Sequence, residues 1–350
     1  MVKIPKSVVF IVLTISIILF LNIISNILLP FVIGVILAYF LDPAADKLEH
    51  KGITRSRATI LILMLFFAFV TLFSYSLGPI LYRQLVALIA QIPMYIRAIN
   101  ISITPYLDMI YHKFGYDDGM AQGVLLKEIS EHTLMVSKNI LSNILSSSIA
   151  VINLFALIFI TPIVTFYLLR DWDLALNKIS TYIPKKYKVE VTDQFVAIDK
   201  VLSAYIRGQT NVCLILGVFY AVGLSMVGLD FGFLIGFLTG IFTFIPYFGV
   251  FIGMVIGTIL ALLQFDTYLP ILLVLGVFIL GQFIEGNFIT PKLVGKKVGI
   301  HPVLIIFSLL VGGSLFGFLG VLFAIPTIAV IGVLVRSFFK KYIKSEFYLD

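Results

Sequence analysis

The chain has 350 residues, of which 60% are hydrophobic and only 12% are charged. Soluble domains are about 45–50% apolar and about 25% charged, so this composition excludes an ordinary soluble protein. The net charge of +7 does not indicate nucleic-acid binding, because the basic residues are scattered beside apolar spans without an aromatic-basic platform. The single cysteine, Cys213, excludes an internal disulfide and a cysteine metal cluster.

The apolar residues group into about eight segments, which predicts an all-α, polytopic integral membrane protein, since a crossing helix needs about 20 apolar residues. These segments are 7–29, 31–41, 58–82, 149–169, 209–228, 231–263, 269–289 and 303–335. The first resembles a signal peptide, but it exceeds an h-region of about 7–15 residues and has no A-x-A cleavage site, so we expect an uncleaved helix. The second is too short to cross alone, so we expect Pro30 to break the chain into a helix and a partial return.

Segment 83–148 is the one substantial extramembrane piece that the sequence predicts. Apolar residues recur there at helical spacing, so we expect amphipathic helices that lie on the membrane or on a neighbouring subunit. Segment 185–206 shows the same pattern beneath a cluster of lysines, which predicts a cytoplasmic interfacial helix. The expected organisation is N-terminal membrane helices at 1–82, the extracytoplasmic segment at 83–148, a membrane helix plus the interfacial helix at 149–208, a transport core at 209–335 and a cytoplasmic tail at 336–350.

Two segments, 231–263 and 303–335, are too long for a single crossing. Each would extend roughly 50 Å as a straight helix, whereas the hydrocarbon core is about 30 Å thick. The helix-breaking residues near their middles are Pro246 and Gly249 in the first segment, and Gly317 and Gly320 in the second. We therefore expect two re-entrant, broken helical hairpins with Pro246 and Gly317 at the hinge or tip, where protein or a water-filled cavity satisfies the interrupted backbone.

The basic residues predict the orientation of the chain. If both termini and the segments 42–57, 170–208 and 290–302 are cytoplasmic, all but five of the 25 Lys and Arg residues lie on that side. The exceptions are Arg83, Arg97, Lys113, Lys127 and Lys138, which all fall in segment 83–148. This distribution follows the positive-inside rule and predicts a multi-pass protein of the cell membrane with both termini in the cytoplasm.

An internal repeat is indicated by residues 227–250 and 298–321, which align at a constant offset of 71. In the predicted orientation span 209–228 runs outward, span 269–289 runs inward, and a hairpin follows each. That arrangement is an inverted-topology repeat, which is typical of secondary transporters with a binding site near mid-membrane. The alternative is that two glycine-rich hairpins resemble each other by chance.

Glu285 is a carboxylate in an otherwise apolar segment, where a charge costs about 2.5–3.5 kcal/mol on insertion scales. Such a residue is retained only if it is paired, hydrated or protonated. Gln282 lies one helical turn earlier on the same face, and Asn287 lies just before a break expected at Pro291. Their oxygens suit a cation, a proton or a polyhydroxyl solute. The alternative is an interfacial glutamate that pairs with Lys292 or Lys296.

The other half of the expected repeat contributes Arg207 and Gln209. Arg207 would neutralise Glu285 or hold an anionic substrate, and the alternative is an arginine whose charged end snorkels to the membrane surface at a helix start. His301 opens the last hairpin and would relay protons near neutral pH, or cap the helix or lie at an interface. Asp42 and Asp171 end spans and are interpreted as boundary residues.

The sequence contains no enzyme signature. It has no G-x-x-x-x-G-K-[ST] nucleotide motif, no H-E-x-x-H metal motif and no G-x-S-x-G nucleophile motif. Histidines and aspartates in segment 83–148 do not meet metal-ligand spacing. We therefore predict a protein that is not an enzyme and holds no cofactor or metal, and whose transport is passive or driven by an ion gradient.

Motifs spread over nearly the whole chain resemble the AI-2E transporter family. They are Leu37-Ala38-Tyr39-Phe40-Leu41-Asp42-Pro43, Tyr167-Leu168-Leu169-Arg170-Asp171, Ile245-Pro246-Tyr247-Phe248-Gly249, Gly281-Gln282 through Glu285-Gly286-Asn287, Pro291, His301-Pro302, Gly312-Gly313, Phe316-Gly317, Gly320 and Ala324-Ile325-Pro326. The resemblance implies export of the small polyol-like signal autoinducer-2, or Na⁺(Li⁺)/H⁺ antiport, and a homo-oligomer.

Three hypotheses about function follow. The first is a secondary exporter of a small polar solute, which Gln282, Asn287 and the hairpins favour. The second is a cation/proton antiporter, which Glu285 and His301 favour. The third is a non-transporting membrane scaffold in envelope or spore assembly, which the sizeable outer segment favours. In each case the lipid bilayer is a partner, and nucleic acid is not.

Overall fold

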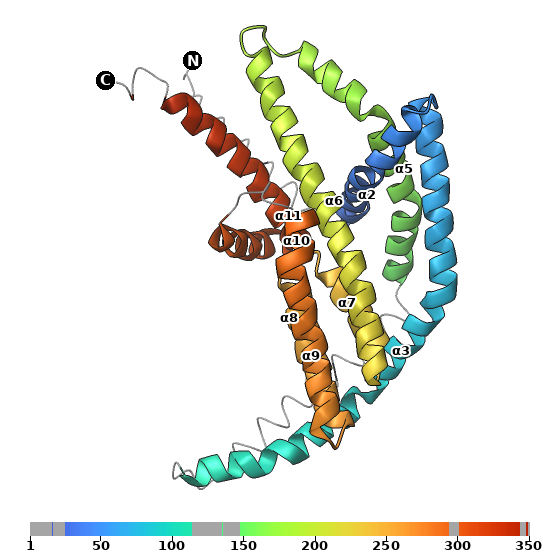
Figure 1. The fold of residues 1–350 in the computed structure, drawn as a ribbon, viewed down its shortest axis with the longest axis vertical. Coiled ribbons are helices and arrows are strands. Elements are labelled where there is room, and N and C mark those ends of the chain that lie inside the picture. The colour runs from blue at the N-terminus through green and yellow to red at the C-terminus, as the bar shows by residue number, and fades with distance from the viewer. Residues whose placement is uncertain are drawn as a thin grey trace. The chain divides into compact units, whose positions relative to one another are not determined.

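The computed structural model describes residues 25–113, 148–293 and 301–343, together with the single positions 16, 135 and 348. In these ranges the chain is helical throughout (Figure 1). The elements are α2 (Ser25–Glu49), α3 (Arg55–Lys113), α5 (Ser148–Thr181), α6 (Lys188–Val227), α7 (Gly232–Phe242), α8 (Phe248–Gln264), α9 (Tyr268–Ile284), the π-helical turn η1 (Glu285–Ile289), α10 (Thr290–Leu293) and α11 (Pro302–Tyr342).

Six of these helical stretches are long and apolar enough to cross a membrane. They are Leu28–Glu49, Arg55–Ile99, Phe155–Thr181, Lys188–Val227, Tyr268–Leu293 and Val303–Tyr342. The helices α7 and α8 are apolar but shorter, as expected for the arms of a broken hairpin. The predicted all-α, polytopic membrane fold is confirmed, while the first predicted span, 7–29, lies mostly outside the described residues.

The expected break at Pro30 is wrong, because α2 continues through Pro30 and Pro43. A proline removes one backbone hydrogen bond, but membrane helices tolerate it where a neighbouring helix supplies polar groups. Here α5 does so: the Thr161 hydroxyl donates to the Pro30 carbonyl and the Thr165 hydroxyl to the Gly34 carbonyl, both at 3.3 Å. The predicted short segment 31–41 is therefore the middle of one full-length span.

The separate amphipathic helices that the sequence predicted are continuous with their neighbouring spans. Helix α3 runs without interruption from Arg55 to Lys113, past residue 83, and α6 joins the interfacial segment 185–206 to the span 209–228. Helix α3 continues through Pro79, Pro93 and Pro105, and α6 continues through Gly208, so the fall in hydrophobicity ends neither helix. At 59 residues α3 would extend about 88 Å, so much of it must lie outside a hydrocarbon core of about 30 Å. The predicted helix over 125–144 falls outside the described residues apart from Met135.

The chain forms two compact units. Unit 1 comprises residues 1–66, 155–212 and 287–350, and unit 2 comprises residues 67–154 and 213–286. Unit 1 therefore contains α2, most of α5, the first part of α6, and α11. Unit 2 contains most of α3, the end of α6, and α7 to α9.

Small residues bring α6 and α7 into backbone contact in unit 2. A Cβ at Gly236 would overlap the backbone of Ala221, and one at Gly240 would overlap that of Gly217. In each helix the two residues are four apart and share one face. Close packing of small residues is how membrane helices associate, since lipid tails compete equally for apolar side chains.

The first predicted hairpin consists of α7 and α8, which pack against each other in unit 2. The helical backbone stops between Phe242 and Phe248, with Tyr247 at a φ of 67°, as the Pro246 motif predicted. A Cβ at Gly249 would overlap the backbone of Thr243, and one at Gly253 would overlap the Thr239 side chain. Glycines at every fourth position of α8 thus permit the two arms to pack closely.

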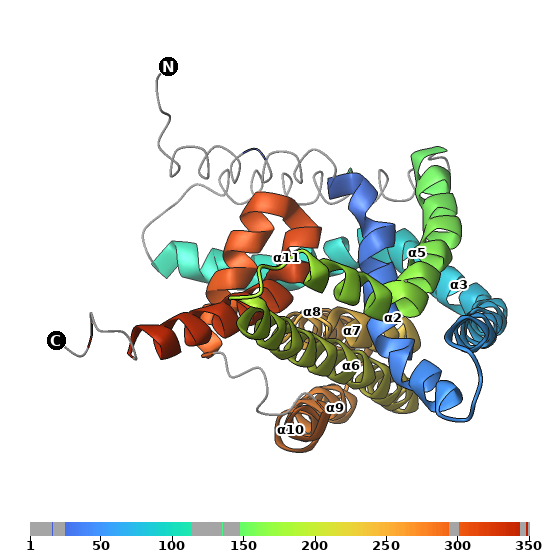
Figure 2. The ribbon, with the colours of Figure 1, turned by 90° about the horizontal axis from the view of Figure 1, so that it is seen from above.

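The second predicted hairpin lies within α11 in unit 1. Gly317 has φ 57° and ψ −137°, a combination essentially confined to glycine, and there the helix breaks. A Cβ at Gly320 would overlap the carbonyl of Gly312, so the arms touch through their backbones. Figures 1 and 2 show the two arms of α11 running in different directions.

Candidate substrate or ion site

Glu285 is buried at the junction of α9 and η1, with 8% of its surface exposed. The Gln282 side chain donates a hydrogen bond to its carboxylate at 3.4 Å. Within the described ranges Glu285 has no ion-pair partner. Of the two lysines considered above as alternative partners, Lys292 is exposed on α10 and Lys296 lies outside the described residues. Glu285 also begins a π-helical turn, and single π turns are frequent at functional sites.

A buried tyrosine lies beside this carboxylate. The Tyr220 ring from α6 packs on Gly281, where a Cβ would overlap the tyrosine hydroxyl, and Gly281 is one turn before Glu285 on α9. The ring also packs against Phe278 with centroids 5.3 Å apart. The Tyr220 hydroxyl is buried and has no hydrogen-bond partner among the residues that the structure describes. The Glu285 carboxylate acts electrostatically on both Tyr220 and Cys213, so the three side chains define one polar neighbourhood in unit 2.

Sequence reasoning missed Tyr220, because a lone tyrosine in an apolar helix is most simply explained as core. The signal that would have found it is a large side chain on one helix that is matched by a glycine on another. A large side chain on one span needs a glycine on another, and Gly281 provides that space four residues before the one membrane-depth glutamate.

A cavity of about 420 Å³ lies between the start of α8 and the end of α9, within unit 2. Its lining residues are Tyr247, Val250, Phe251, Met254, Phe278, Ile279, Gln282 and Phe283. Gln282 is the only residue with an amide side chain among them and also bonds Glu285. A solute in this cavity would therefore contact the carboxylate through one hydrogen-bonded side chain.

None of the other predicted site residues lines this cavity. Asn287 is an exposed residue of η1, and Pro291 is an exposed residue of α10. Gln209 is buried on α6 in unit 1, with 4% of its surface exposed. His301 caps α11: its Nδ1 accepts a hydrogen bond from the Val303 backbone N–H at 3.3 Å, and Pro302 follows at the first helical position. Of the roles considered for His301, the structure therefore shows the helix cap.

Arg207 has a partner in unit 1. Its guanidinium donates to the Asp42 carboxylate at 2.7 Å and to the Tyr39 carbonyl at 2.8 Å. The same Asp42 accepts from Arg55 at 2.5 Å, and Arg55 also bonds Asp46 at 2.6 Å. Asp42, interpreted from the sequence as a boundary residue, thus joins two arginines from α3 and α6 to α2. Sequence reasoning could not find this network, because its members are far apart in the chain.

The fold defines a polytopic α-helical membrane protein with a buried polar cluster between its apolar helices. The sequence matches the AI-2E family transporter over residues 8–340, and the chain belongs to that family.

Relatives of similar length carry names of the same kind. The chain is 31% identical to the "Putative transport protein YrrI" of Bacillus subtilis over 91% of this chain and 88% of the relative. It is 29% identical to the "Putative transport protein YueF" of the same organism over 93% and 86%. It is also 27% identical to the "Putative permease PerM" of Escherichia coli over 89% and 88%.

Proposed function

We propose that this protein is a secondary transporter that exports a small polar solute such as autoinducer-2 across the cell membrane, with Glu285 at its binding site. The observation that carries the proposal is the buried carboxylate. It has one hydrogen bond, from Gln282, and no ion pair within the described part of the chain. A charge at membrane depth is retained only where it has a use, so this carboxylate is available to a ligand.

The dimensions and chemistry of the α8–α9 cavity support a small ligand. Its volume of about 420 Å³ lies within the usual range of about 300–1,000 Å³ for small-molecule sites. Such sites are mostly apolar with a few polar groups that orient the ligand. Here Gln282 is such a group, and it is hydrogen-bonded to Glu285. The Tyr220 hydroxyl, which packs against Gly281, has no hydrogen-bond partner in the described part of the chain.

The two hairpins support alternating access by related halves. The helix break at Gly317 lies 71 residues after Pro246, which is the offset of the sequence repeat. Gly249 and Gly320 show the same offset, and each packs its backbone against the preceding arm. Equivalent breaks in two repeats are the pattern of transporters that bind their substrate where the helices are interrupted.

The decisive experiment is transport by the purified protein in liposomes, with a panel of small solutes that includes autoinducer-2, in the presence and absence of a sodium or proton gradient. Replacing Glu285 by glutamine keeps the side-chain volume and removes the charge, so we expect the initial rate to fall about tenfold or more, as for loss of a charged hydrogen bond. The control is Asp266→Asn, which removes a carboxylate from the exposed α8–α9 loop and leaves the rate unchanged.

Equal flux in the Glu285→Gln variant and the natural protein would refute the proposed site. A protein that moves no solute or ion, yet holds a stable protein partner, would instead support the scaffold hypothesis.

A second candidate function is Na⁺(Li⁺)/H⁺ antiport, with a monovalent cation or proton as the ligand of Glu285. It is favoured by the same carboxylate, because a cation or a proton would neutralise the buried charge that no described basic residue pairs. A pH-sensitive dye inside the liposomes tests it: sodium or lithium pulses should change the internal pH with the natural protein and not with Glu285→Gln. Absence of a response with the natural protein removes this candidate.

A further inference from the structure

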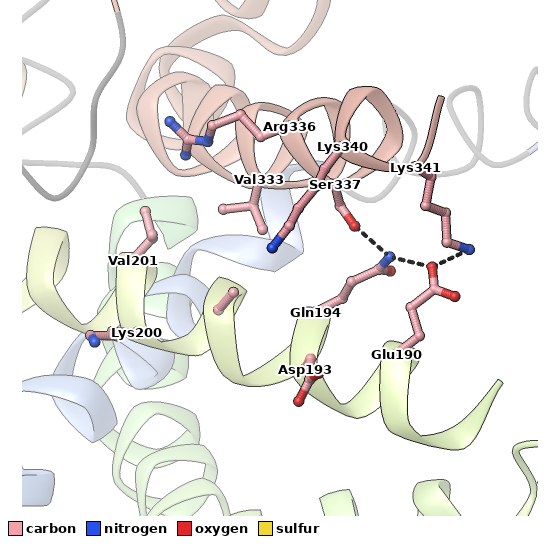
Figure 3. Close-up of a pocket in the computed structure, with 11 residues that line it drawn as sticks. Glu190, Asp193, Gln194, Lys200, Val201, Val333, Arg336, Ser337, Lys340 and Lys341 are labelled. Atoms are coloured by element: carbon pink, nitrogen blue, oxygen red, sulfur yellow. Dashed lines mark hydrogen bonds and ion pairs between the residues drawn. The ribbon is translucent and has the colours of Figure 1, made fainter. Parts of the chain in front are cut away.

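A larger cavity lies between the first half of α6 and the last turns of α11, within unit 1 (Figure 3). Its volume is about 650 Å³, and we call it the α6–α11 groove. Its lining residues are Glu190, Asp193, Gln194, Ala197, Lys200, Val201, Val333, Arg336, Ser337, Lys340 and Lys341. None of them belongs to the Glu285 site.

The groove carries an excess of positive charge. Of the two acidic residues in the groove, Glu190 is already paired with Lys341. The Gln194 amide donates hydrogen bonds to Glu190 at 3.3 Å and to Ser337 at 3.0 Å. Lys200, Arg336 and Lys340 have no ion-pair partner among the described residues. In Figure 3, Lys340 extends from α11 toward α6, whereas Asp193 points away from α11. The unpaired cations therefore outnumber the one unpaired carboxylate.

The floor of the groove is apolar. Val201 of α6 and Val333 of α11 form a buried cluster with Ala329, and Ala197 packs against it. Polar groups that bind anions, such as the Arg336 guanidinium and the Ser337 hydroxyl, lie one turn or less beyond this floor. In Figure 3 the Arg336 guanidinium and the Lys340 ammonium extend from α11 in different directions, and both are long side chains that can turn toward one phosphoryl group. The apolar floor matches a hydrocarbon chain.

Both walls of the groove belong to helices that are long and apolar enough to span the membrane. The residues that line the groove lie in the predicted interfacial segment 185–206 and in the last turns of α11, so we expect the groove at the level of the lipid headgroups, where basic pockets between membrane helices bind anionic lipids. We propose that the α6–α11 groove binds an anionic phospholipid, with its phosphate on Arg336 and Lys340 and the upper part of an acyl chain along Val201 and Val333. The two helices are then held together by lipid as well as by the Glu190–Lys341 pair.

The test is binding of phosphatidylglycerol with a fluorescent acyl chain to the full-length protein in neutral detergent, followed by anisotropy. The double variant Arg336→Gln/Lys340→Gln should bind about tenfold or more weakly. Each basic residue near an anionic lipid surface strengthens binding about fivefold, and the variant removes two of them. The exchange variant Arg336→Lys/Lys340→Arg keeps the charge and should retain most of the affinity. The matched control Lys185→Gln/Lys186→Gln removes two exposed lysines just before α6 and should change affinity less than twofold.

Two competitors identify the source of the phosphate. Unlabelled phosphatidylglycerol should displace the probe, whereas phosphatidylcholine, whose headgroup has no net charge, should displace it at least about tenfold less well. The proposal is overturned if phosphatidylcholine competes equally, if inorganic phosphate alone displaces the probe at the same concentration, or if both double glutamine variants lose affinity alike.

Discussion

Partly buried polar side chains in unit 1 bond partners that are distant in the sequence. Arg207 and Asp42 are separated by 165 positions, and the Tyr39 hydroxyl donates to Asp199 across 160 positions. Charged groups that leave water need such partners, because an unpaired charge among apolar helices is costly. Asp42 has the most demanding position of these residues, since it accepts from two guanidinium groups at once.

We therefore expect Asp42→Asn to lower the free energy of unfolding by about 1–3 kcal/mol, the range for charge-assisted hydrogen bonds, reduced here because about a third of the side chain is exposed. Arg55 and Arg207 would both lose a counter-charge. Thermal unfolding in detergent measures the loss. Asp46→Asn is the control: its side chain is 49% exposed and, among the described residues, bonds Arg55 alone, so a loss of about 0–1 kcal/mol is expected. Equal losses in the two variants would show that a carboxylate bonded to two arginines stabilises the fold no more than a carboxylate bonded to one.

The two hairpins owe their shape to glycine in different ways. In the α7–α8 hairpin, Gly249 and Gly253 permit close approach, while the unusual backbone angle at the break belongs to Tyr247. In α11 the break itself belongs to Gly317, around which a Cβ would meet no atom within 4 Å. The first hairpin therefore needs glycine for close packing of its arms, whereas the second needs it for the backbone conformation at Gly317 as well as for close packing at Gly320.

Gly317→Ala should lower the free energy of unfolding by about 1–3 kcal/mol, because alanine at φ 57° and ψ −137° is strained even in open space. The melting temperature in detergent should fall by a few degrees. Gly276→Ala provides the comparison: it also adds a methyl group in open space, but in the regular helix α9, where alanine is the better helix former. A fall of the same size for Gly276→Ala would mean that backbone strain is not the cause.

Six helices in the described part of the chain are long enough to span a membrane, and the basic residues predict their orientation. Helix α6 starts beside a group of lysines near Lys186 and ends at Val227, so basic residues lie at its start and its last turns are apolar. With all but five basic residues assigned to the cytoplasm, the α5–α6 connection should be cytoplasmic, and the α8–α9 connection should face outward.

Labelling of introduced cysteines tests this orientation. In a Cys213→Ala background, Lys186→Cys and Asp266→Cys each place a thiol at an exposed connecting position. A membrane-impermeant maleimide added to intact spheroplasts should label Asp266→Cys at least about tenfold faster than Lys186→Cys, and inside-out vesicles should reverse this ratio. The opposite pattern in both preparations would invert the orientation.

The sequence by itself determined the helical membrane class, the family and the positions of both hairpin breaks. These features depend on local properties: apolar run length, and glycine or proline within such a run. The same reasoning failed at Pro30, and it did not extend α3 and α6 past the ends of their apolar segments, because a helix ends where its backbone is interrupted and not where polar residues begin.

Only the tertiary structure decided the surroundings of the polar residues. Sequence reasoning placed Gln282 and Glu285 on one helix face, since they are three residues apart, and in the structure the two side chains are hydrogen-bonded. It offered Glu285 as a partner for Arg207, whereas the structure pairs Arg207 with Asp42, and it missed Tyr220. Which distant side chains meet depends on how helices cross, and that is set by small residues such as Gly240 and Gly281, whose partners are known only once the chain is folded.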